Sequence, residues 1–239
     1  MGREIAIRRL VLGDRGIKGL YFSDFHYKGK LSEPYLKRLR AITIREKPDF
    51  IMCLGDLIDY NYSLEGDRLP IVAGLRELHA TYGKYAIYGN HERNNGREDR
   101  YKDVLNRGAF RLLVNSEVVL NIRGHKIGLT GLDDGLLGDI ERVPMVKECD
   151  YRIVMVHEPD VVDYLEGYPF NLQVSGHTHG GQVRLPLLGR LVSVRGGRHY
   201  DKGYYEIEEN KGLYVSSGIG NSRLPIRVGN CPEVVVLKI

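Results

Sequence analysis

The stretch FIMCLGD, residues 50–56, decides the fold class, because a short and wholly apolar run ends there in a Gly-Asp pair. A continuous apolar run of this length is typical of a strand that is buried on both faces, as in a parallel sheet. A helical pattern precedes it over residues 33–47, and another follows over residues 69–81. Helix, buried strand and helix in this order predict an α/β fold.

Further short apolar runs also end at polar residues. They cover residues 20–22, 85–88, 153–156 and 172–175, and they lead to Asp24, Asn90, His157 and His177. In α/β sheets the carboxyl ends of the strands form the edge where ligands bind. Residues 111–121 and 126–132 flank a turn at Arg123-Gly124, which predicts an antiparallel pair in the second half. A short helix is expected over residues 161–166, and residues 180–212 are expected to form one long loop that contains several glycines. We therefore expect five strands to deliver polar side chains to one edge of mixed sheets.

The side chains expected at this edge are two carboxylates, four imidazoles and one amide, with no thiolate. They are Asp24, His26, Asp56, Asn90, His157, His177 and His179. This donor set suits Mn²⁺, Fe²⁺ or Zn²⁺ rather than Ca²⁺ or a structural zinc site. The set is too large for one tetrahedral ion but suits a pair of ions about 3.5–4 Å apart that share a carboxylate.

Each motif also has a plain structural interpretation when it is taken alone. Asp24-x-His26 is a weak signal, and Gly55-Asp56 after a strand is also a common turn. The quartet over residues 89–92 and the run GHTHGG over residues 176–181 are stronger, because polar residues at a strand end contribute little to packing. Alternate residues of a strand point the same way, so both histidines of that run are expected to face one site. The five motifs in this order favour a functional site.

In order and spacing, these motifs resemble the five signature blocks of the calcineurin-like metallophosphoesterases. The blocks are Asp24-x-His26, Gly55-Asp56-x-x-Asp59, Gly89-Asn90-His91-Glu92, His157 and Gly176-His177-x-His179. The resemblance runs from about residue 19 to the C-terminus and implies a four-layer αββα sandwich, with two central mixed β-sheets flanked by helices. No repeat or low-complexity linker interrupts the chain, so we expect one domain over residues 1–239.

The resemblance also implies a role for each residue of the blocks. One metal ion would be held by Asp24, His26, Asp56 and His179, and the other by Asp56, Asn90, His157 and His177. A hydroxide that bridges the two ions would attack the phosphorus. His91 would stabilise charge or protonate the leaving oxygen, and Glu92 would orient His91. Manganese is the expected ion, with zinc and iron as alternatives. Asp59 is interpreted as a helix-start residue or as a partner of the ligands.

A narrower resemblance points to one branch of this family. It rests on the run GHTHGGQV (176–183) with Pro186, on GLDD (131–134), and on segments of residues 218–233. The branch holds bacterial phosphodiesterases that act near the membrane or cell wall, including a UDP-diacylglucosamine hydrolase. It implies an anionic phosphodiester or a nucleotide-sugar-lipid as the substrate.

Members of this branch often carry a membrane anchor or a twin-arginine leader, and this chain departs from them. No run of 18 or more apolar residues occurs, and Arg8-Arg9 is followed by only three apolar residues. The three cysteines are odd in number and far apart, which favours a reducing compartment. The sequence therefore predicts a cytoplasmic protein with peripheral membrane contact as an additional expectation.

The charge balance is mildly basic and uneven along the chain. Lys plus Arg is 35 and Asp plus Glu is 31, a net charge of +4, which excludes a nucleic-acid-coating tail and an acidic disordered chain. Residues 180–202 contain four Arg and one Lys against one Asp, so they hold this excess. We expect this segment to attract an anionic substrate. Arg184, Arg223 and Arg227 are candidate phosphate ligands, and a solvated surface role is the alternative for each.

The leading functional hypothesis is a binuclear phosphodiesterase or pyrophosphatase that acts on a small or lipid-linked phosphodiester. A nuclease on the same scaffold is an alternative, but nucleases usually add a capping domain or a basic groove with stacking aromatic residues. A nucleic acid is therefore not the expected partner. The other alternative is an inactive protein-binding scaffold, although such proteins usually lose ligands and none is missing here. The ligand set does not separate monoesters from diesters, and the oligomeric state stays open.

Overall fold

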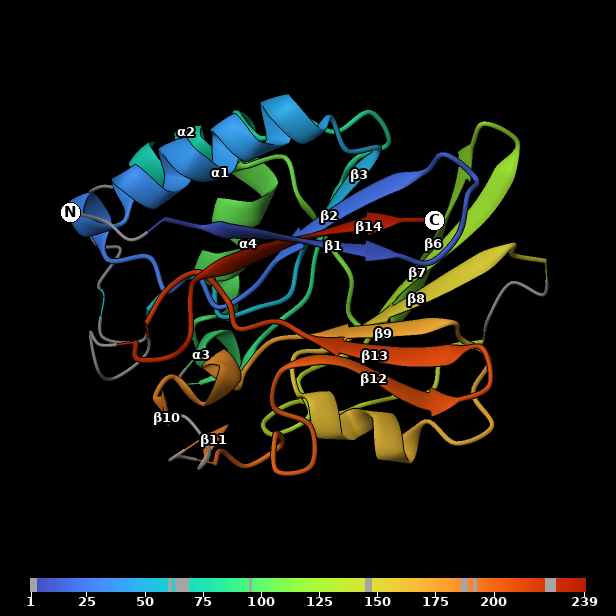
Figure 1. The fold of residues 1–239 in the computed structure, drawn as a ribbon. Coiled ribbons are helices and arrows are strands. Elements are labelled where there is room, and N and C mark those ends of the chain that lie inside the picture. Colours follow the sequence, from blue (N-terminus) through green and yellow to red (C-terminus); the bar gives the residue numbers. More distant parts are fainter. Residues whose placement is uncertain are drawn as a thin grey trace.

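The structure is a computed structural model that describes residues 4–59, 62, 69–94, 96–144, 148–185, 189–190, 193–221 and 227–239. Two six-stranded sheets pack face to face, and helices cover the outer face of each sheet (Figure 1). Both sheets contain parallel and antiparallel pairs. The predicted sandwich of two mixed sheets flanked by helices is therefore confirmed.

The first sheet has the strand order β1-β14-β2-β3-β4-β5. Its strands are β1 (Ala6–Val11), β14 (Glu233–Lys238), β2 (Lys18–Phe22), β3 (Phe50–Cys53), β4 (Lys84–Ala86) and β5 (Arg111–Leu112). Neighbouring strands are parallel except for β14 and β2. Because β2, β3 and β4 run in one direction, their carboxyl ends meet at one edge.

The second sheet has the strand order β12-β13-β9-β8-β7-β6. Its strands are β12 (Gly203–Glu208), β13 (Lys211–Val215), β9 (Leu172–Ser175), β8 (Tyr151–Met155), β7 (His125–Gly131) and β6 (Ser116–Ile122). The four inner strands are parallel, and the outer pairs β6–β7 and β12–β13 are antiparallel. A small separate pair joins β10 (Arg184–Leu185) to β11 (Gly189–Arg190). The hairpin predicted around Arg123-Gly124 is present between β6 and β7.

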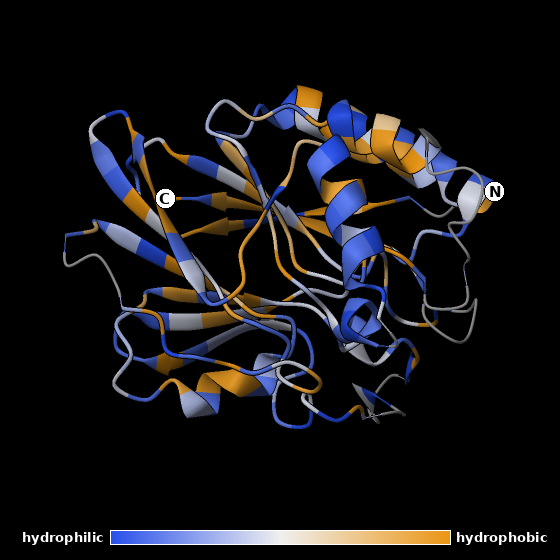
Figure 2. Cartoon of the chain, turned by 180° about the vertical axis from the view of Figure 1, so that it is seen from behind, coloured by the Kyte–Doolittle hydropathy of each residue, from blue (hydrophilic) through white to orange (hydrophobic). Residues whose placement is uncertain are grey.

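The helices lie outside the two sheets. They are α1 (Glu33–Glu46), α2 (Leu69–Arg76), α3 (Asn90–Arg93), α4 (Glu98–Arg107) and the 3₁₀ helices η1 (Gly29–Leu31), η2 (Pro159–Tyr164) and η3 (His179–Gly181). α1 turns its apolar side to the first sheet (Figure 2), and its C-cap residue is Lys47, whose left-handed backbone (φ 48°) precedes Pro48. In the described part of the chain, no helix has both the length and the apolar character needed to cross a bilayer.

The strand β3 shows how the layers are held together. Phe50 and Met52 join the apolar cluster between the two sheets, whereas Ile51 and Cys53 join the cluster beneath the helices of the first sheet. A third cluster lies beneath η2 on the outer face of the second sheet. Since β3 is buried on both faces, its apolar run has no alternation, as the sequence predicts.

Three expectations about local structure need correction. The helix predicted over residues 69–81 ends earlier, at Arg76. The short helix predicted over residues 161–166 is the 3₁₀ helix η2. Residues 180–212 are not one long loop, since β12 lies within them. The strand β12 is an edge strand that alternates half-buried and exposed residues, and its sequence GYYEIE mixes apolar and charged residues, so its signal is weaker than that of the continuous apolar runs.

Candidate metal centre

The predicted site residues gather where five strands of the two sheets end (Figure 1). The strand ends β2, β3, β4, β8 and β9 lead to Asp24 and His26, to Asp56, to Asn90 and His91, to His157, and to His177 and His179 respectively. The first three strands belong to one sheet and the last two belong to the other. The site therefore lies at the shared edge of the two sheets.

Left-handed backbone places many of these side chains. Asp24, His26, Asp56, His177 and His179 have φ values of 49°, 46°, 49°, 68° and 51°. Such a conformation costs a residue with a side chain about 1–3 kcal/mol and is concentrated at functional sites. The two histidines of the GHTHGG run also lie beyond the end of β9. Tight turns bring them together, so the expected reason, alternation along a strand, does not apply.

One group of donor atoms lies on the side of β8 and β4. His157 Nε2 lies 3.4 Å from Asp56 Oδ2, and His177 Nδ1 lies 3.1 Å from Asn90 Oδ1. The opposite ring nitrogens donate to backbone carbonyls, His157 Nδ1 to Leu54 at 2.6 Å and His177 Nε2 to Arg195 at 2.7 Å. These hydrogen bonds leave His157 Nε2 and His177 Nδ1 facing the site. Against the effect of burial, the Asp56 carboxylate raises the pKa of His157 well above its usual range, so a metal cation at Nε2 would take the place of a proton.

A second group lies on the side of β2. His179 Nε2 lies 3.0 Å from His26 Nε2 and 3.5 Å from Asp24 Oδ1. Asp56 Oδ2 lies 3.7 Å from His26 Nε2, so the same carboxylate oxygen borders both groups. A carboxylate in this position can bridge two ions.

The donor chemistry of both groups fits divalent metal ions. Burial lowers the pKa of His26 to about 3, and burial together with Arg227 holds the pKa of His179 well below its usual range. Both rings are therefore neutral, as metal ligands must be. Nε2 of His157 is fully buried and has no hydrogen-bond partner among the described residues. A bound cation would give His157 Nε2 the partner that it lacks. On the β2 side, a cation would likewise relieve the close approach of His26 Nε2 and His179 Nε2.

His91 borders the site, and one of its ring nitrogens lies within 4.8 Å of donor atoms of His26 and Asp56. Its backbone N–H donates to Asp56 Oδ1 at 3.0 Å, and its Nε2 lies 3.6 Å from Asp56 Oδ2. Its ring also contacts the ring of His26, with centroids 4.6 Å apart. The His91 side chain is 14% exposed, whereas that of His26 is fully buried, so a substrate can reach His91 from outside.

Glu92 has contacts that the sequence does not predict. Its carboxylate accepts hydrogen bonds from the backbone N–H groups of Asp56, Leu57, Ile58 and Gly89, at 2.8–3.3 Å. The carboxylate thereby ties the turn after β3 to the turn after β4. Burial and the neighbouring Asp56 raise the pKa of Glu92 to about 8. Its expected role in orienting the His91 ring stays a prediction.

Two glycines of the sequence motifs allow the loops to approach closely. A Cβ on Gly89 would lie 2.4 Å from Asp56 Oδ1, and a Cβ on Gly176 would lie 2.4 Å from Asp24 Oδ2. Both contacts are far too short for any side chain. The sequence motifs therefore need glycine for steric reasons at these positions.

Acidic residues near the centre support its loops. Asp59 Oδ2 lies 3.7 Å from His26 Nδ1, which agrees with its interpretation as a partner of a ligand. Asp133 forms a two-pronged pair with Arg93, at 2.8 and 2.5 Å. Asp134 accepts from the backbone N–H groups of residues 136 and 137. These two aspartates order the loop after β7.

The three candidate phosphate-binding arginines have different surroundings. Arg184 pairs with Asp201 at 2.5 Å, and Arg223 lies outside the described residues. Arg227 is 3% exposed, donates to the carbonyls of Ser217 and Gly220, and has Nη2 at 3.3 Å from His179 Nδ1. Arg184 and Arg227 therefore support loops around the centre. Direct phosphate binding by any of the three stays a prediction.

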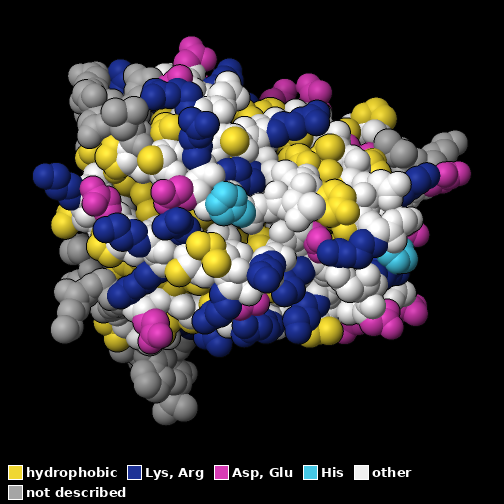
Figure 3. Space-filling model, turned by 90° about the horizontal axis from the view of Figure 1, so that it is seen from above, with side chains coloured by type: hydrophobic (Ala, Val, Ile, Leu, Met, Phe, Trp, Pro, Cys, Tyr) yellow, Lys and Arg dark blue, Asp and Glu magenta, His cyan; other side chains and the backbone are white. Residues whose placement is uncertain are grey.

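The positive charge of residues 180–202 is partly compensated within the segment. Arg184 and Arg190 share the carboxylate of Asp201, and Arg190 also donates to backbone carbonyls. Lys and Arg gather elsewhere as well, on the face formed by the outer helices (Figure 3), where α1 exposes Lys37, Arg40 and further basic residues. Attraction of substrate by residues 180–202 stays a prediction.

The sequence reasoning missed the backbone carbonyls of Leu54 and Arg195, which orient two of the histidines. It also missed Arg97 and Arg100, which line a pocket beside His91. Neither feature has a motif, because the first uses main-chain atoms and the pocket of the second also takes Ile58 from the loop after β3.

Comparison with known proteins agrees with this geometry. The sequence profile of the calcineurin-like phosphoesterases matches residues 18–181, which include every donor residue described above. YkuE, an uncharacterized metallophosphoesterase of Bacillus subtilis, is 36% identical over 232 residues, which cover 95% of this chain and 80% of the relative. The phosphodiesterase YaeI of Escherichia coli is 28% identical over 225 residues, which cover 93% of this chain and 82% of the relative.

Among solved structures, the NAD nucleotidase of Haemophilus influenzae has a similar fold. The TM-score is 0.53 at 15% sequence identity, and the similarity covers 83% of this chain and 44% of the other. At this identity the likeness concerns the fold alone.

Proposed function

The chain belongs to the calcineurin-like phosphoesterase family, and we propose that it is a phosphodiesterase that works with two divalent metal ions. Membership makes it a metal-dependent hydrolase of phosphate esters. The observation that carries the proposal is the position of Asp56, whose Oδ2 lies within 3.7 Å of His157 on one side and His26 on the other. A single carboxylate between two donor groups is the arrangement that a pair of ions requires.

The ligands divide between the two ions by their place around Asp56. One ion would be held by Asp24, His26, Asp56 and His179, and the other by Asp56, Asn90, His157 and His177. Support comes from the inward-facing nitrogens of His157 and His177 and from the facing Nε2 atoms of His26 and His179. When bound, such ions polarise phosphoryl oxygens and lower the pKa of water toward neutrality.

The residues of the chain contribute orientation and proton transfer. Glu92 holds the turns that carry Asp56 and His91, so the bridging carboxylate and the outer histidine keep their relative positions. His91, whose side chain is 14% exposed, lies next to the donor set, and we assign it to the leaving oxygen, where it donates a proton or stabilises charge. Alkoxide leaving groups need this proton more than nitrophenolate does.

We assign a phosphodiester as the substrate and manganese as the ion. The printed function of YaeI, a phosphodiesterase, supports the diester. The mixed nitrogen and oxygen donor set suits manganese, zinc or iron, and metal availability selects among them. A lipid-linked diester is the narrower form of the proposal. Its support is the sequence resemblance to membrane-associated bacterial phosphodiesterases.

A direct test compares three substrates with the Mn²⁺-loaded protein. They are para-nitrophenyl phosphate, bis(para-nitrophenyl) phosphate and a UDP-linked glycolipid. The proposal expects the diester to be hydrolysed with a higher kcat/KM than the monoester. A strong preference for the monoester would overturn the substrate class, whereas a lack of turnover of the glycolipid would overturn only the narrower form.

His91→Ala tests the second part of the proposal. With both ions still bound, turnover of an unactivated alkyl diester should fall by about 10²–10⁴-fold, and turnover of the nitrophenyl diester should fall less. His125→Ala, a change of an exposed histidine on β7, is the matched control. Equal effects on both esters would argue against a role for His91 at the leaving oxygen.

Peripheral membrane contact is a separate part of the proposal, supported by exposed basic residues of α1 such as Lys37, Arg40 and Arg45. Basic residues near an anionic surface contribute about 1 kcal/mol each. Sedimentation with phosphatidylglycerol vesicles, but not with phosphatidylcholine vesicles, is the expected result. Equal recovery with both would contradict it.

A further inference from the structure

The short helix α3 carries His91, the residue assigned to the leaving oxygen. It consists of four residues, Asn90–Arg93, and a single helical turn is not stable by itself in water. Contacts from outside the helix therefore have to fix it in place. A histidine that transfers a proton must lie within hydrogen-bond distance of the leaving oxygen, and a displacement of about 1 Å can cost about 100-fold in rate.

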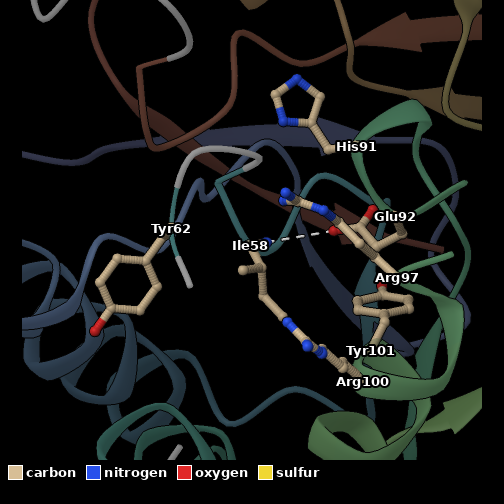
Figure 4. A pocket seen from close by; sticks show the side chains of 7 residues that line it. All are labelled: Ile58, Tyr62, His91, Glu92, Arg97, Arg100 and Tyr101. Carbon is tan, nitrogen blue, oxygen red and sulfur yellow. Dashed lines mark hydrogen bonds between the residues drawn. The ribbon is translucent and has the colours of Figure 1, made fainter. Parts of the chain in front are cut away.

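One set of contacts fixes α3 from the side of the first sheet. The Glu92 carboxylate accepts hydrogen bonds from the turns after β3 and β4, and the His91 N–H donates to Asp56 Oδ1 at 3.0 Å. Figure 4 shows the Glu92 carboxylate joined to Ile58, whereas the ring of His91 points in a different direction. These contacts hold the backbone of α3 against the turns of the first sheet.

The second anchor is Arg93, the last residue of α3. Its guanidinium group forms a two-pronged pair with Asp133, at 2.8 and 2.5 Å, and lies over the ring of Tyr88, 4.3 Å from the centroid. Its Nη1 also lies 3.8 Å from the Glu98 carboxylate. The side chains of Arg93 and Asp133 are 22% and 6% exposed, so water has limited access to the pair. A two-pronged pair of this kind fixes orientation as well as distance.

Asp133 is itself held firmly in the loop after β7. Its carboxylate accepts from two backbone N–H groups of the same loop, at 2.8 and 3.2 Å, and its own N–H donates to Asn115 Oδ1 at 3.0 Å. The strand β7 belongs to the second sheet, whereas α3 follows β4 of the first sheet. Arg93 therefore ties α3 to the opposite sheet, and His91 lies on a helix that is held from both sheets.

We propose that the Arg93–Asp133 pair is a positioning element, which holds α3 so that His91 meets the leaving oxygen. The inference rests on the proposed phosphodiesterase function. Neither residue of the pair touches the reacting atoms, and both act through His91. Without the pair, α3 would be held from the first sheet alone, and His91 would transfer its proton less effectively. The resulting loss should be greatest for leaving groups that need this proton.

The test compares two diesters of similar size, methyl para-nitrophenyl phosphate and methyl phenyl phosphate, at saturating Mn²⁺. The phenolate is the poorer leaving group and needs the proton more. Arg93→Met and Asp133→Asn should each lower kcat/KM for the phenyl ester by about tenfold and for the nitrophenyl ester by less than about threefold. Arg93→Lys should restore part of the loss, because it keeps the charge without the paired donors.

The same changes in a His91→Ala background decide whether the pair acts through His91. There, Asp133→Asn should change turnover of the phenyl ester by less than about twofold, because the group that it positions is absent. A tenfold loss in both backgrounds would assign the effect to the metal ligands or to the fold. That result, or equal losses on the two esters, would overturn the inference.

Arg123 and Asp49 provide a matched control. They form a two-pronged pair, at 2.9 and 2.8 Å, that also joins the two sheets. Arg123 lies in the turn before β7 and Asp49 directly before β3, at the opposite end of each strand from the candidate metal centre. Arg123→Met should leave the ratio of the two esters unchanged. A shift of this ratio as large as that in Arg93→Met would mean that any tie between the sheets has this effect, and would overturn the specific role of Arg93.

Amide hydrogen exchange separates this inference from the proposed function, since it needs no turnover. In the Mn²⁺-loaded protein, Arg93→Met should speed exchange over residues 90–93 by about tenfold, and Arg123→Met should not. Unchanged exchange in Arg93→Met would overturn the anchoring of α3 whatever the activity is. If the wild type hydrolyses neither ester, the proposed function fails, and the exchange rates still decide whether the pair anchors α3.

Discussion

The two sides of the candidate metal centre differ in the groups that contact the ring nitrogens of their histidines on the side away from the centre. On the β8 side, His157 and His177 each donate to a backbone carbonyl, at 2.6 and 2.7 Å. On the β2 side, Arg227 Nη2 lies 3.3 Å from His179 Nδ1, and the Asp59 carboxylate lies 3.7 Å from His26 Nδ1, beyond hydrogen-bond distance. A carbonyl behind a ligating ring fixes its tautomer and raises its basicity, whereas a cation withdraws electron density. The difference predicts a tightly held ion on the β8 side and a weaker one on the β2 side.

The largest effect is expected at Asp56, which joins the two sides. Asp56→Asn removes the charge shared by both ions, so both should bind more weakly. The loss of diesterase activity should exceed the roughly 10–100-fold loss that follows substitution of residues hydrogen-bonded to metal ligands. Metal content per chain by mass spectrometry and hydrolysis of bis(para-nitrophenyl) phosphate measure the two effects. Asp103→Asn, on the exposed side of α4, is the control. Two retained ions with wild-type affinity would refute the shared carboxylate.

Two variants compare the sides directly. His26→Gln should remove the weaker ion and leave a tight one, whereas His157→Gln should remove the tight ion and leave a weak one. The remaining Mn²⁺ should bind about tenfold more tightly in the first variant than in the second. Titration followed by electron paramagnetic resonance gives both constants. Equal constants would remove the basis of the comparison.

A third prediction concerns Arg227, whose guanidinium group lies next to His179. Arg227 is buried and donates to the Ser217 carbonyl at 2.6 Å, so Arg227→Met would leave buried carbonyls without their donor. Unfolding in urea should show a loss of about 2–4 kcal/mol. Affinity for the β8-side ion should stay within about twofold of the wild type.

Arg107→Met, a change at a half-exposed position of α4, should cost less than about 0.5 kcal/mol. If Arg227→Met lowers the affinity for the β8-side ion as much as that for the β2-side ion, the two sides are not independent.

The smallest effect on metal binding is expected from Asp160, which supports the loop that is hydrogen-bonded to His177. Asp160 accepts from the backbone N–H groups of Arg198 and His199, at 2.7 and 3.0 Å, and so holds the loop whose Arg195 carbonyl orients His177. Asp160→Asn should lower affinity for the β8-side ion by about tenfold.

Asp163→Asn is the matched control for this change, because Asp163 lies on the same 3₁₀ helix and its carboxylate contacts the side chains of His199 and Tyr200. Metal titration of both variants is the measurement. Equal effects would assign the loss to the helix η2 in general rather than to support of His177.

Much of the donor set could be predicted from the sequence because the strands are short apolar runs and the ligands follow them. Asp24, Asp56 and His157 were placed by this rule, and the structure brings them together. The rule worked because burial of a strand on both faces leaves a local pattern that needs no knowledge of its neighbours. It was less informative over residues 180–212, where the edge strand β12 mixes apolar and charged residues.

Sequence alone was enough for the fold class, the family and the residue types at the strand ends, since these depend on local periodicity and motif spacing. The folded chain decided which atoms face inward, because the carbonyls of Leu54 and Arg195 set the tautomers of histidines distant in sequence. It likewise paired Arg184 with Asp201 and set Ile58 beside Arg97 and Arg100. Contacts of this kind depend on how separate loops approach in space, and no local pattern of residues carries that information.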